Sequence, residues 1–396
     1  MSRAPTDAPA LAPGRIAGLD AWRALLMAGG LLVHGSAWLP PAPLFVLITD
    51  LSHSFRMGAF FGISGFLTAL ALNRRDPARW LRRRLVQLGI PALVGLSLLC
   101  PLIWLIVMTS DQAADNQALS PFAWHHLWFL FALMLYSSCA VVLHDIDRRH
   151  GLARWLERAG AEGGPLALML TALSTAGLIA LSLALIRWAF PPHVQESFHS
   201  AELIAGYLPI FVLGFVLARA DRLRAGALAA HELCLLICLG VLLAYVAAGA
   251  LAPGTLLPAA VLATAAALCP PAVFLLILRS ALSIRRVPAL MGHVAEASYT
   301  VYILHYPISV LINTHVATGV ERHLAYVLTV LASGTAAFAF HVLVVQHVPV
   351  LALLLNGKFE RRSPAERAAA PGPELPVSED ARIAAAPLQP AVAAAD

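Results

Sequence analysis

The chain has 396 residues, of which 59% are hydrophobic and only 12% are charged, and its mean hydropathy is +0.76. Because soluble domains carry about 25% charged residues, this composition excludes an ordinary soluble protein and predicts several membrane-spanning helices. The net charge of +5 comes from arginines in short loops, so it indicates orientation in a lipid bilayer and not binding to nucleic acid. The five cysteines lie in apolar segments without a CxxC pair, which favours small core side chains over a disulfide framework.

Ten segments are apolar enough to cross a bilayer, which takes about 20 residues. We expect them at 19–39, 45–72, 85–108, 126–144, 166–189, 203–219, 232–251, 255–279, 296–316 and 324–349. Residues 1–18 are rich in proline and alanine and lack the apolar core of a cleavable signal peptide. Residues 358–396 form a similar stretch that we expect to be a disordered cytoplasmic tail. The prediction is an all-α bundle of about ten transmembrane helices within residues 19–357.

The distribution of arginine along the chain predicts how this bundle is oriented. Arginines gather after the second, fourth, sixth and eighth segments, whereas the loops between these hold only Arg187 and Arg322. The positive-inside rule therefore places both termini in the cytoplasm. In this orientation Arg23 lies in the cytoplasmic half of the first helix, and His34 lies toward its outer half.

Arg23 and His34 are the residues around which we expect the function to be organised. They stand eleven positions apart, so they share one helix face at about 16 Å along the axis. Ionisable side chains inside a membrane usually mark a functional path. An imidazole in apolar surroundings favours its neutral form, which suits a general base for a hydroxyl, and Arg23 could pair with an anionic group. From spacing alone, an Asp20–Arg23 ion pair and a packing histidine explain these residues equally well.

Five stretches, taken in order, resemble the membrane acyltransferase-3 family. They are Leu19–Arg23 followed by His34, His53–Met57 with Phe60–Phe66, Arg79–Arg82 with Gly89–Pro91, His126–Leu130, and Ser298–Pro307. Each motif is weak by itself, and the specificity lies in their common order. The forms HSFRM and HLWFL look most like the branch of the family that contains a bacterial glucan succinyltransferase.

This resemblance implies an integral enzyme of the bacterial inner membrane that transfers an acyl group, acetyl or succinyl. The donor would be cytoplasmic acyl-CoA, with no permanently bound cofactor. The acceptor would be a hydroxyl of an extracytoplasmic glycan, such as periplasmic glucan or a surface polysaccharide. His34 falls on the family's essential histidine and Arg23 on its paired arginine, so we expect both to be catalytic. Direct transfer and a transient acyl-His34 intermediate both remain open, as does the choice between monomer and homodimer.

The acyl-CoA side is expected at the arginine-rich loop after the second segment. Arg79 and Arg82 are three positions apart and would share a helix face, forming a fork for phosphates. In the related family this loop is linked to acyl-CoA, so we expect these two to bind the donor, whereas Arg83 and Arg84 look like determinants of topology. Ser64 is expected either to line the donor tunnel or to allow close helix packing.

Three further residues, one pair and one single residue, could contact the substrates. His53 and Arg56 begin the second segment, and a structural salt bridge explains Arg56 as well as substrate contact does. Asp20, next to Arg23 along the first helix, belongs to the same group of possible contacts.

His126 and Trp128 open the fourth segment, and the resemblance favours an acceptor-side role, although an interfacial aromatic belt is the default for Trp128. Tyr299 and His305 are six positions apart, about 1.7 turns, so they point to opposite faces and serve different purposes. His305, near the middle of its segment, is the better functional candidate of the two.

Histidine and glutamate also alternate at three-residue steps in the outer loop, at His193, Glu196, His199 and Glu202. Such steps drift around a helix, so we expect an interfacial helix or a glycan contact and no metal site. The alternative to an enzyme is a secondary transporter or flippase of a glycan or lipid substrate. Transporters often show paired hydropathy repeats, and no convincing repeat is visible here.

Overall fold

A computed structural model describes residues 16–158, 192–249, 256–284 and 286–358 of the chain. The chain divides into a large unit, Met1–Gly357, and a second unit, Lys358–Asp396, and all that follows concerns the large unit. The described residues form helices and turns and contain no strand, so the prediction of an all-α fold is confirmed.

Within the described residues, four helical stretches are long and apolar enough to cross a membrane: Pro43–Leu72, Pro77–Met108, His125–His150 and Arg322–Val345. A fifth span results if Leu203–Leu217 and Asp221–Ala229, which meet at a bend of 113°, are taken as one. The prediction of ten spans is therefore not confirmed. One of the ten, 166–189, lies outside the described residues.

Other predicted segments also form helices in the described residues. The first of them, α1 (Ala17–His34), has 18 residues and carries Asp20 and Arg23 among its apolar side chains. The further helices are α7 (Pro192–Leu217), α8 (Asp221–Ala229), α9 (His231–Gly249), α10 (Leu256–Ser283), α11 (Ala289–Leu311), the π-helix η4 (Ile312–Val316) and α13 (Pro349–Asn356).

The long spans are composites whose breaks follow from their sequences. Pro77–Met108 consists of α3 (Pro77–Val94), the π-helix η1 (Gly95–Leu99) and α4 (Cys100–Met108). Asp76 caps the start of α3 by accepting a hydrogen bond from the Arg79 amide at 2.8 Å, and proline follows at the first helical position. His125–His150 consists of the 3-10 turn η3 (His125–Leu127) and α5 (Trp128–His150).

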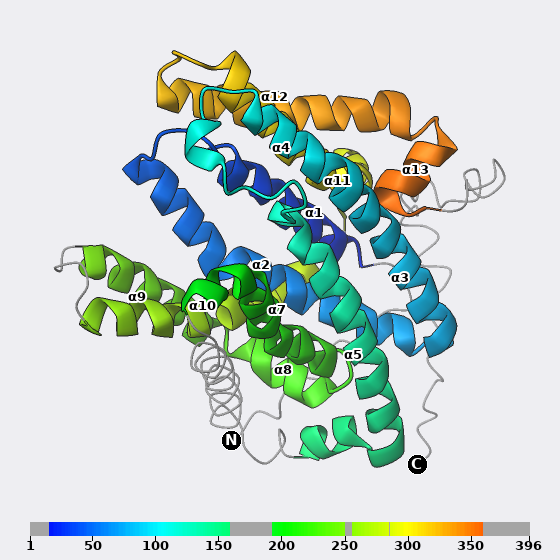
Figure 1. Cartoon of the computed structure of the whole chain (residues 1–396). Coiled ribbons are helices and arrows are strands. Elements are labelled where there is room, and N and C mark those ends of the chain that lie inside the picture. Colours follow the sequence, from blue (N-terminus) through cyan, green and yellow to red (C-terminus); the bar gives the residue numbers. More distant parts are fainter. Residues whose placement is uncertain (1–15, 159–191, 250–255, 285, 359–396) are drawn as a thin grey trace, which may run out of the picture. The chain divides into compact units, whose positions relative to one another are not determined.

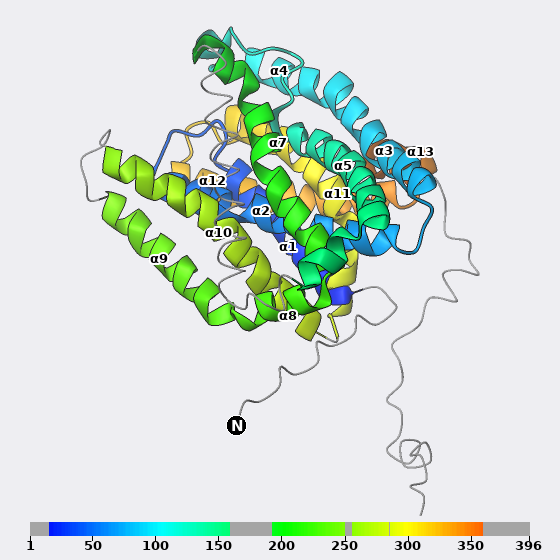
Figure 2. The ribbon, with the colours of Figure 1, turned by 90° about the horizontal axis from the view of Figure 1, so that it is seen from below.

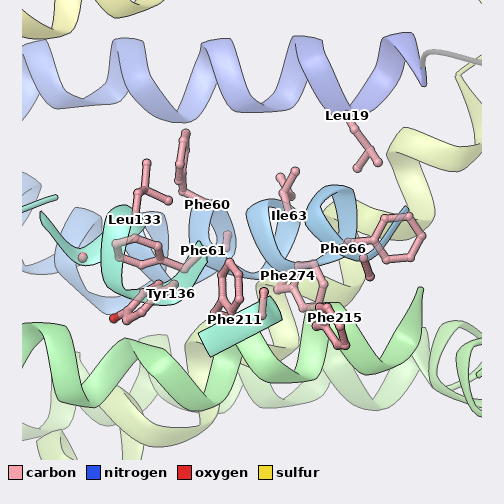
Figure 3. Packing of buried hydrophobic residues seen from close by; sticks show 14 of the residues in the cluster. Leu19, Phe60, Phe61, Ile63, Phe66, Leu133, Tyr136, Phe211, Phe215 and Phe274 are labelled. Atoms are coloured by element: carbon pink, nitrogen blue, oxygen red, sulfur yellow. The ribbon is translucent and has the colours of Figure 1, made fainter. Parts of the chain in front are cut away.

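The helix α2 (Pro43–Leu72) is the centre of the fold and packs most extensively against α7 and α10. Figure 3 shows the aromatic core at this junction, where Phe61, Tyr136, Phe211 and Phe274 are fully buried. Small residues allow the α2 and α7 backbones to touch, as is common between helices in membranes. A Cβ atom on Gly65 of α2 would overlap the Phe211 carbonyl oxygen of α7.

The first helix packs against four neighbours on one side and exposes Leu25 and Leu32 on the other. The neighbours are α2, α10, α11 and α12 (Arg322–Phe340), and Figures 1 and 2 show α1 beside α2 and α11. Arg23 and His34 lie on the packed side, because Arg23 lies over the Phe60 ring of α2 and the His34 ring lies beside His305 of α11.

Candidate active site

A cluster of three histidines and two tyrosines surrounds the end of α1, where His34 is the last helical residue. This histidine cluster consists of His34 from α1, His126 from η3, and Tyr302, His305 and Tyr306 from α11. The centroid of the His34 ring lies 5.2 Å from that of His305, 5.1 Å from that of Tyr306 and 6.1 Å from that of His126. His126 and His305, whose ring centroids are 5.6 Å apart, are buried, whereas His34 is half-buried.

The hydrogen bonds of His305 define which of its ring nitrogens can accept a proton. Its Nδ1 lies 2.9 Å from the carbonyl oxygen of Val301, which can only accept, so Nδ1 carries the hydrogen. The other nitrogen, Nε2, is therefore a bare acceptor, and it is buried without a hydrogen-bond partner. Unsatisfied buried polar atoms are rare in proteins and call for an explanation. A substrate or a water molecule at this position would supply the missing partner.

Two local features of the backbone shape the cluster. His125 adopts a left-handed conformation with φ of 39°, which is uncommon for a residue other than glycine and is found at functional sites. This turn presents the next residue, His126, whose carbonyl oxygen accepts a hydrogen bond from the Tyr302 hydroxyl. Pro307 has no amide hydrogen, so it leaves the carbonyl of Ile303 open within α11, and His126 lies near that carbonyl.

Arg56 of α2 reaches the same region and lies against the backbone of α1. Its Nε donates to Ser52 Oγ at 2.7 Å, and its Nη1 donates to the Leu26 carbonyl oxygen at 3.3 Å. Gly30 makes this approach possible, because a Cβ atom there would stand 3.2 Å from Arg56 Nη1 and 4.0 Å from His305 Nε2. Among the described residues no carboxylate pairs with Arg56, so the expected salt bridge is absent from this part of the chain.

At the other end of α1 lies a pocket of about 210 Å³, which we call the arginine pocket. Four arginines line it: Arg23 of α1, Arg75 from the turn after α2, and Arg83 and Arg84 of α3. Arg84 Nη1 donates to Gln87 Oε1 at 3.1 Å, which directs its guanidinium along the pocket wall. Four guanidinium groups around one cavity create a site for a polyanion, because arginine pairs with phosphate through parallel hydrogen bonds.

Asp20 lines a second pocket, of about 190 Å³, which shares Arg75 and two apolar residues with the first. One carboxylate oxygen of Asp20 lies 4.0 Å from Arg23 Nη1, so the predicted i, i+3 pair is present at the limit of an ion pair. The two pockets therefore form one basic surface.

A series of neighbouring side chains links the arginine pocket with the histidine cluster. The Ser64 hydroxyl lies in the arginine pocket and is buried without a hydrogen-bond partner. The Tyr299 hydroxyl, also buried and unpartnered, feels the charges of Arg23 and Arg84. The Tyr302 ring follows one turn later, with its centroid 6.4 Å from that of Tyr299. Arg23 itself lies over the Phe60 ring, 5.4 Å from its centroid.

The structure thus brings together most residues that the sequence singles out, and it separates three from the rest. Arg79 and Arg82 are exposed and do not line the arginine pocket. His53 is exposed on α2 but lies near enough to His34 for an electrostatic interaction with it. Trp128 stacks on Tyr207 with a centroid distance of 6.1 Å and an interplanar angle of 19°, so it belongs to the aromatic core.

Sequence reasoning missed Arg75 and Tyr306, and it took Arg83 and Arg84 for determinants of topology. Tyr306 had a signal, because it directly follows His305 inside the Ser298–Pro307 stretch. Within the described residues no group of histidine, cysteine or carboxylate side chains forms a metal-binding set. The side chains of His193, Glu196, His199 and Glu202 lie outside the part that the structure describes.

Comparison with known proteins identifies the family of the chain. The family of the acyltransferase domain Acyl_transf_3 matches residues 16–344, so the chain belongs to this family of acyltransferases. With its membrane-spanning helices, it is a membrane protein of that class. The resemblance drawn from the five sequence motifs is confirmed.

Particular relatives carry the name glucans biosynthesis protein C. Those from Salmonella paratyphi B, Salmonella schwarzengrund and Salmonella enteritidis PT4 are each 27% identical to this chain over 225 residues. The match covers 50% of this chain and 56% of each relative, so it spans about half of their length. No solved structure matches the chain.

Proposed function

We propose that this protein is an O-acyltransferase that moves an acyl group, acetyl or succinyl, from cytoplasmic acyl-CoA to a hydroxyl of an extracytoplasmic glycan. The observation that carries the proposal is the layout of α1, which places Arg23 in the arginine pocket and His34 in the histidine cluster. One rigid helix thereby holds an anion-binding end and a proton-accepting end about 16 Å apart.

The arginine pocket suits the phosphates of the donor. Its volume of about 210 Å³ accommodates a phosphate-bearing part of acyl-CoA, while the thioester arm extends away from it. Ser64 and Tyr299 offer unpartnered hydroxyl groups along the way toward the histidine cluster. The pantetheine arm of acyl-CoA carries amide groups, which would find hydrogen-bond partners in these hydroxyl groups. This favours a pantetheine arm over a purely apolar chain as the occupant of this region.

The transfer itself needs a base, and His34 is the residue in position to supply it. In this proposal a neutral His34 takes the proton of the acceptor hydroxyl, whose oxygen attacks the thioester carbonyl. The carbon–sulfur bond then breaks, and the CoA thiolate takes the proton back from the imidazolium. His305 Nε2, a bare buried acceptor on a ring whose centroid lies 5.2 Å from that of His34, accepts a hydrogen bond from the bound substrate in this proposal. In the competing mechanism His34 is the nucleophile: its imidazole nitrogen attacks the thioester carbonyl, the CoA thiolate leaves, and the acceptor hydroxyl then takes the acyl group from the imidazole and gives up its proton to the thiolate.

Arg56 is the cation nearest to the reacting groups in this scheme. Its Nη1 and His305 Nε2 both lie beside Gly30, within one turn of His34. A guanidinium there stabilises the negative charge that develops on the carbonyl oxygen, the term that usually contributes most to such catalysis.

The acceptor and the location rest on different observations. A periplasmic glucan or a surface polysaccharide is proposed because the matched relatives are named for glucan biosynthesis. The arginine-rich loops favour cytoplasmic termini in the bacterial inner membrane, with the arginine pocket on the side where acyl-CoA is found.

The test is mass spectrometry of periplasmic and surface glycans from cells that express the wild type, His34→Ala or Arg23→Ala at matched membrane levels. An acyl mass present only with the wild type supports the reaction class and identifies the acyl group. Identical glycans in all three strains, with each protein folded in the membrane, would refute it.

A further inference from the structure

The α1 helix ends directly at His34, and the turn that follows it is bonded by a side chain from another helix. Asn313 Nδ2 donates one hydrogen bond to the Gly35 carbonyl oxygen at 3.0 Å and another to the Ala37 carbonyl oxygen at 2.7 Å. The last carbonyls of a helix have no intrahelical donor. Here a single side-chain amide, far away in the sequence, satisfies two carbonyls of the turn that follows the helix.

Asn313 is itself fixed from the other side. It is only 4% exposed, and its Oδ1 accepts a hydrogen bond from Thr329 Oγ1 of α12 at 2.5 Å. It lies in η4, the π-helical turn that continues α11 two turns beyond His305. Such turns are frequent at functional sites. The amide therefore links the end of α1 to α12 and to the helix that carries the rest of the histidine cluster.

The end of α1 is held both by its own turn and by side chains from other elements. Within the turn, the Ala37 amide donates to the His34 carbonyl oxygen at 3.1 Å. Gly35 adopts a right-handed conformation with φ of −62°, so the left-handed glycine cap that ends many helices is absent here. Trp38 takes a left-handed conformation with φ of 68°, and its carbonyl oxygen accepts a hydrogen bond from Gln112 Nε2 at 3.0 Å. Asn313 provides two further bonds from outside the turn.

We propose that Asn313 is a positioning residue for His34, and this rests on the proposed function of His34 as the base. Without the two donated hydrogen bonds, the turn after His34 is free to shift, and the imidazole shifts with it. A displacement of about 1 Å at a reacting group costs about 100-fold in rate. The arginine pocket lies at the other end of α1, so donor binding is expected to stay unchanged.

The test compares three variants in membranes by the release of CoA from the acyl-CoA that the wild type uses, acetyl-CoA or succinyl-CoA. Asn313→Asp keeps the size and the acceptor for Thr329 but removes both donors. Thr329→Val is the matched control, because it removes the bond on the other side of Asn313 and leaves its two donors intact. His34→Ala reports on the proposed function itself.

We expect Asn313→Asp to lower kcat at least tenfold with the KM for acyl-CoA changed less than twofold, and Thr329→Val to retain kcat within threefold. Equal kcat values for these two variants, or a loss in Asn313→Asp that follows only the amount of folded protein, would overturn the proposal. If Asn313→Asp accumulates poorly, Asn313→Gln gives the same comparison, because its longer arm cannot reach both carbonyls. An active His34→Ala variant would instead refute the proposed function, so the two failures are distinguishable.

Discussion

The contact between α2 and α7 allows a sharp prediction about stability. A Cβ atom on Gly65 would overlap the Phe211 carbonyl oxygen and stand 2.9 Å from its carbon and 3.1 Å from the Phe215 amide nitrogen. All three atoms belong to the backbone, so no side chain can swing aside and the two helices must separate. Overpacking of this kind costs about 1–3 kcal/mol. We expect the upper end of that range for Gly65→Ala, because the contact lies in the fully buried core.

The measurement is the apparent Tm of the purified protein in one detergent at one scan rate, since unfolding of such proteins is often irreversible. Gly240→Ala in α9 is the matched control, because a Cβ atom there meets nothing within 4 Å. It is expected to be neutral or to stabilise by about 0.5–1 kcal/mol through higher helix propensity. Gly214→Ala would overlap the Gly62 carbonyl at the same crossing, so the double variant should cost less than the sum of the single ones. Equal Tm values for Gly65→Ala and Gly240→Ala would refute the inference of backbone contact.

Three further predictions concern the donor, the site and the pH dependence. Losing one charge-assisted hydrogen bond to a phosphate costs about 1.5–3 kcal/mol of binding free energy, so Arg84→Gln should raise the KM for acyl-CoA at least tenfold. The control is Arg82→Gln, at an exposed residue outside the pocket, which should change this KM by about twofold at most. Gly30→Ala places a methyl group 3.2 Å from Arg56 Nη1 and should lower kcat several-fold with little change in Tm; an unchanged kcat would contradict the role of Arg56. Hydrogen bonds from the His323 and Leu324 amides lower the pKa of Glu321, which caps α12, from 4.5 to about 2. Glu321→Ala should therefore have a lower Tm than the wild type at neutral pH, and this difference should vanish as the pH falls from 4.5 toward 2; a difference that is constant with pH would exclude the carboxylate cap.

The central pair of residues could be predicted from the sequence because helix periodicity is a local property. Arg23 and His34 share a face of α1 by their spacing alone, and the six-residue step from Tyr299 to His305 places one near the arginine pocket and the other beside His34. The common order of the motifs added His126, which no spacing rule connects to His34.

The choice of arginines could not be made from charge spacing. Arg79 and Arg82 are spaced to share a helix face, but both are exposed and neither lines the arginine pocket. Trp80, which is buried, marks the inward face of α3, and Arg83 and Arg84 follow it at three and four positions. An apolar neighbour at helical spacing was therefore the better signal for which arginines enter the pocket.

Among the described residues four or five of the ten predicted spans are found, and part of the difference has a local cause. A window of apolar residues does not reveal a bend such as the one of 113° between Leu217 and Asp221, where Ala220 leaves the helical conformation. In α1 the charged residues Asp20 and Arg23 lower the hydropathy of an 18-residue helix.

The most direct test of the account measures turnover and donor binding separately in purified His34→Ala. A general base contributes about 10²–10⁴-fold to the rate, so we predict that turnover of acyl-CoA with the glycan acceptor falls by that factor. Because the arginine pocket lies about 16 Å away along α1, we predict that the Kd for acyl-CoA changes by less than about threefold, a difference of about 0.7 kcal/mol. Turnover close to that of the wild type, or a loss of donor binding as large as the loss of turnover, would contradict the assignment of the two sites to the two ends of this helix.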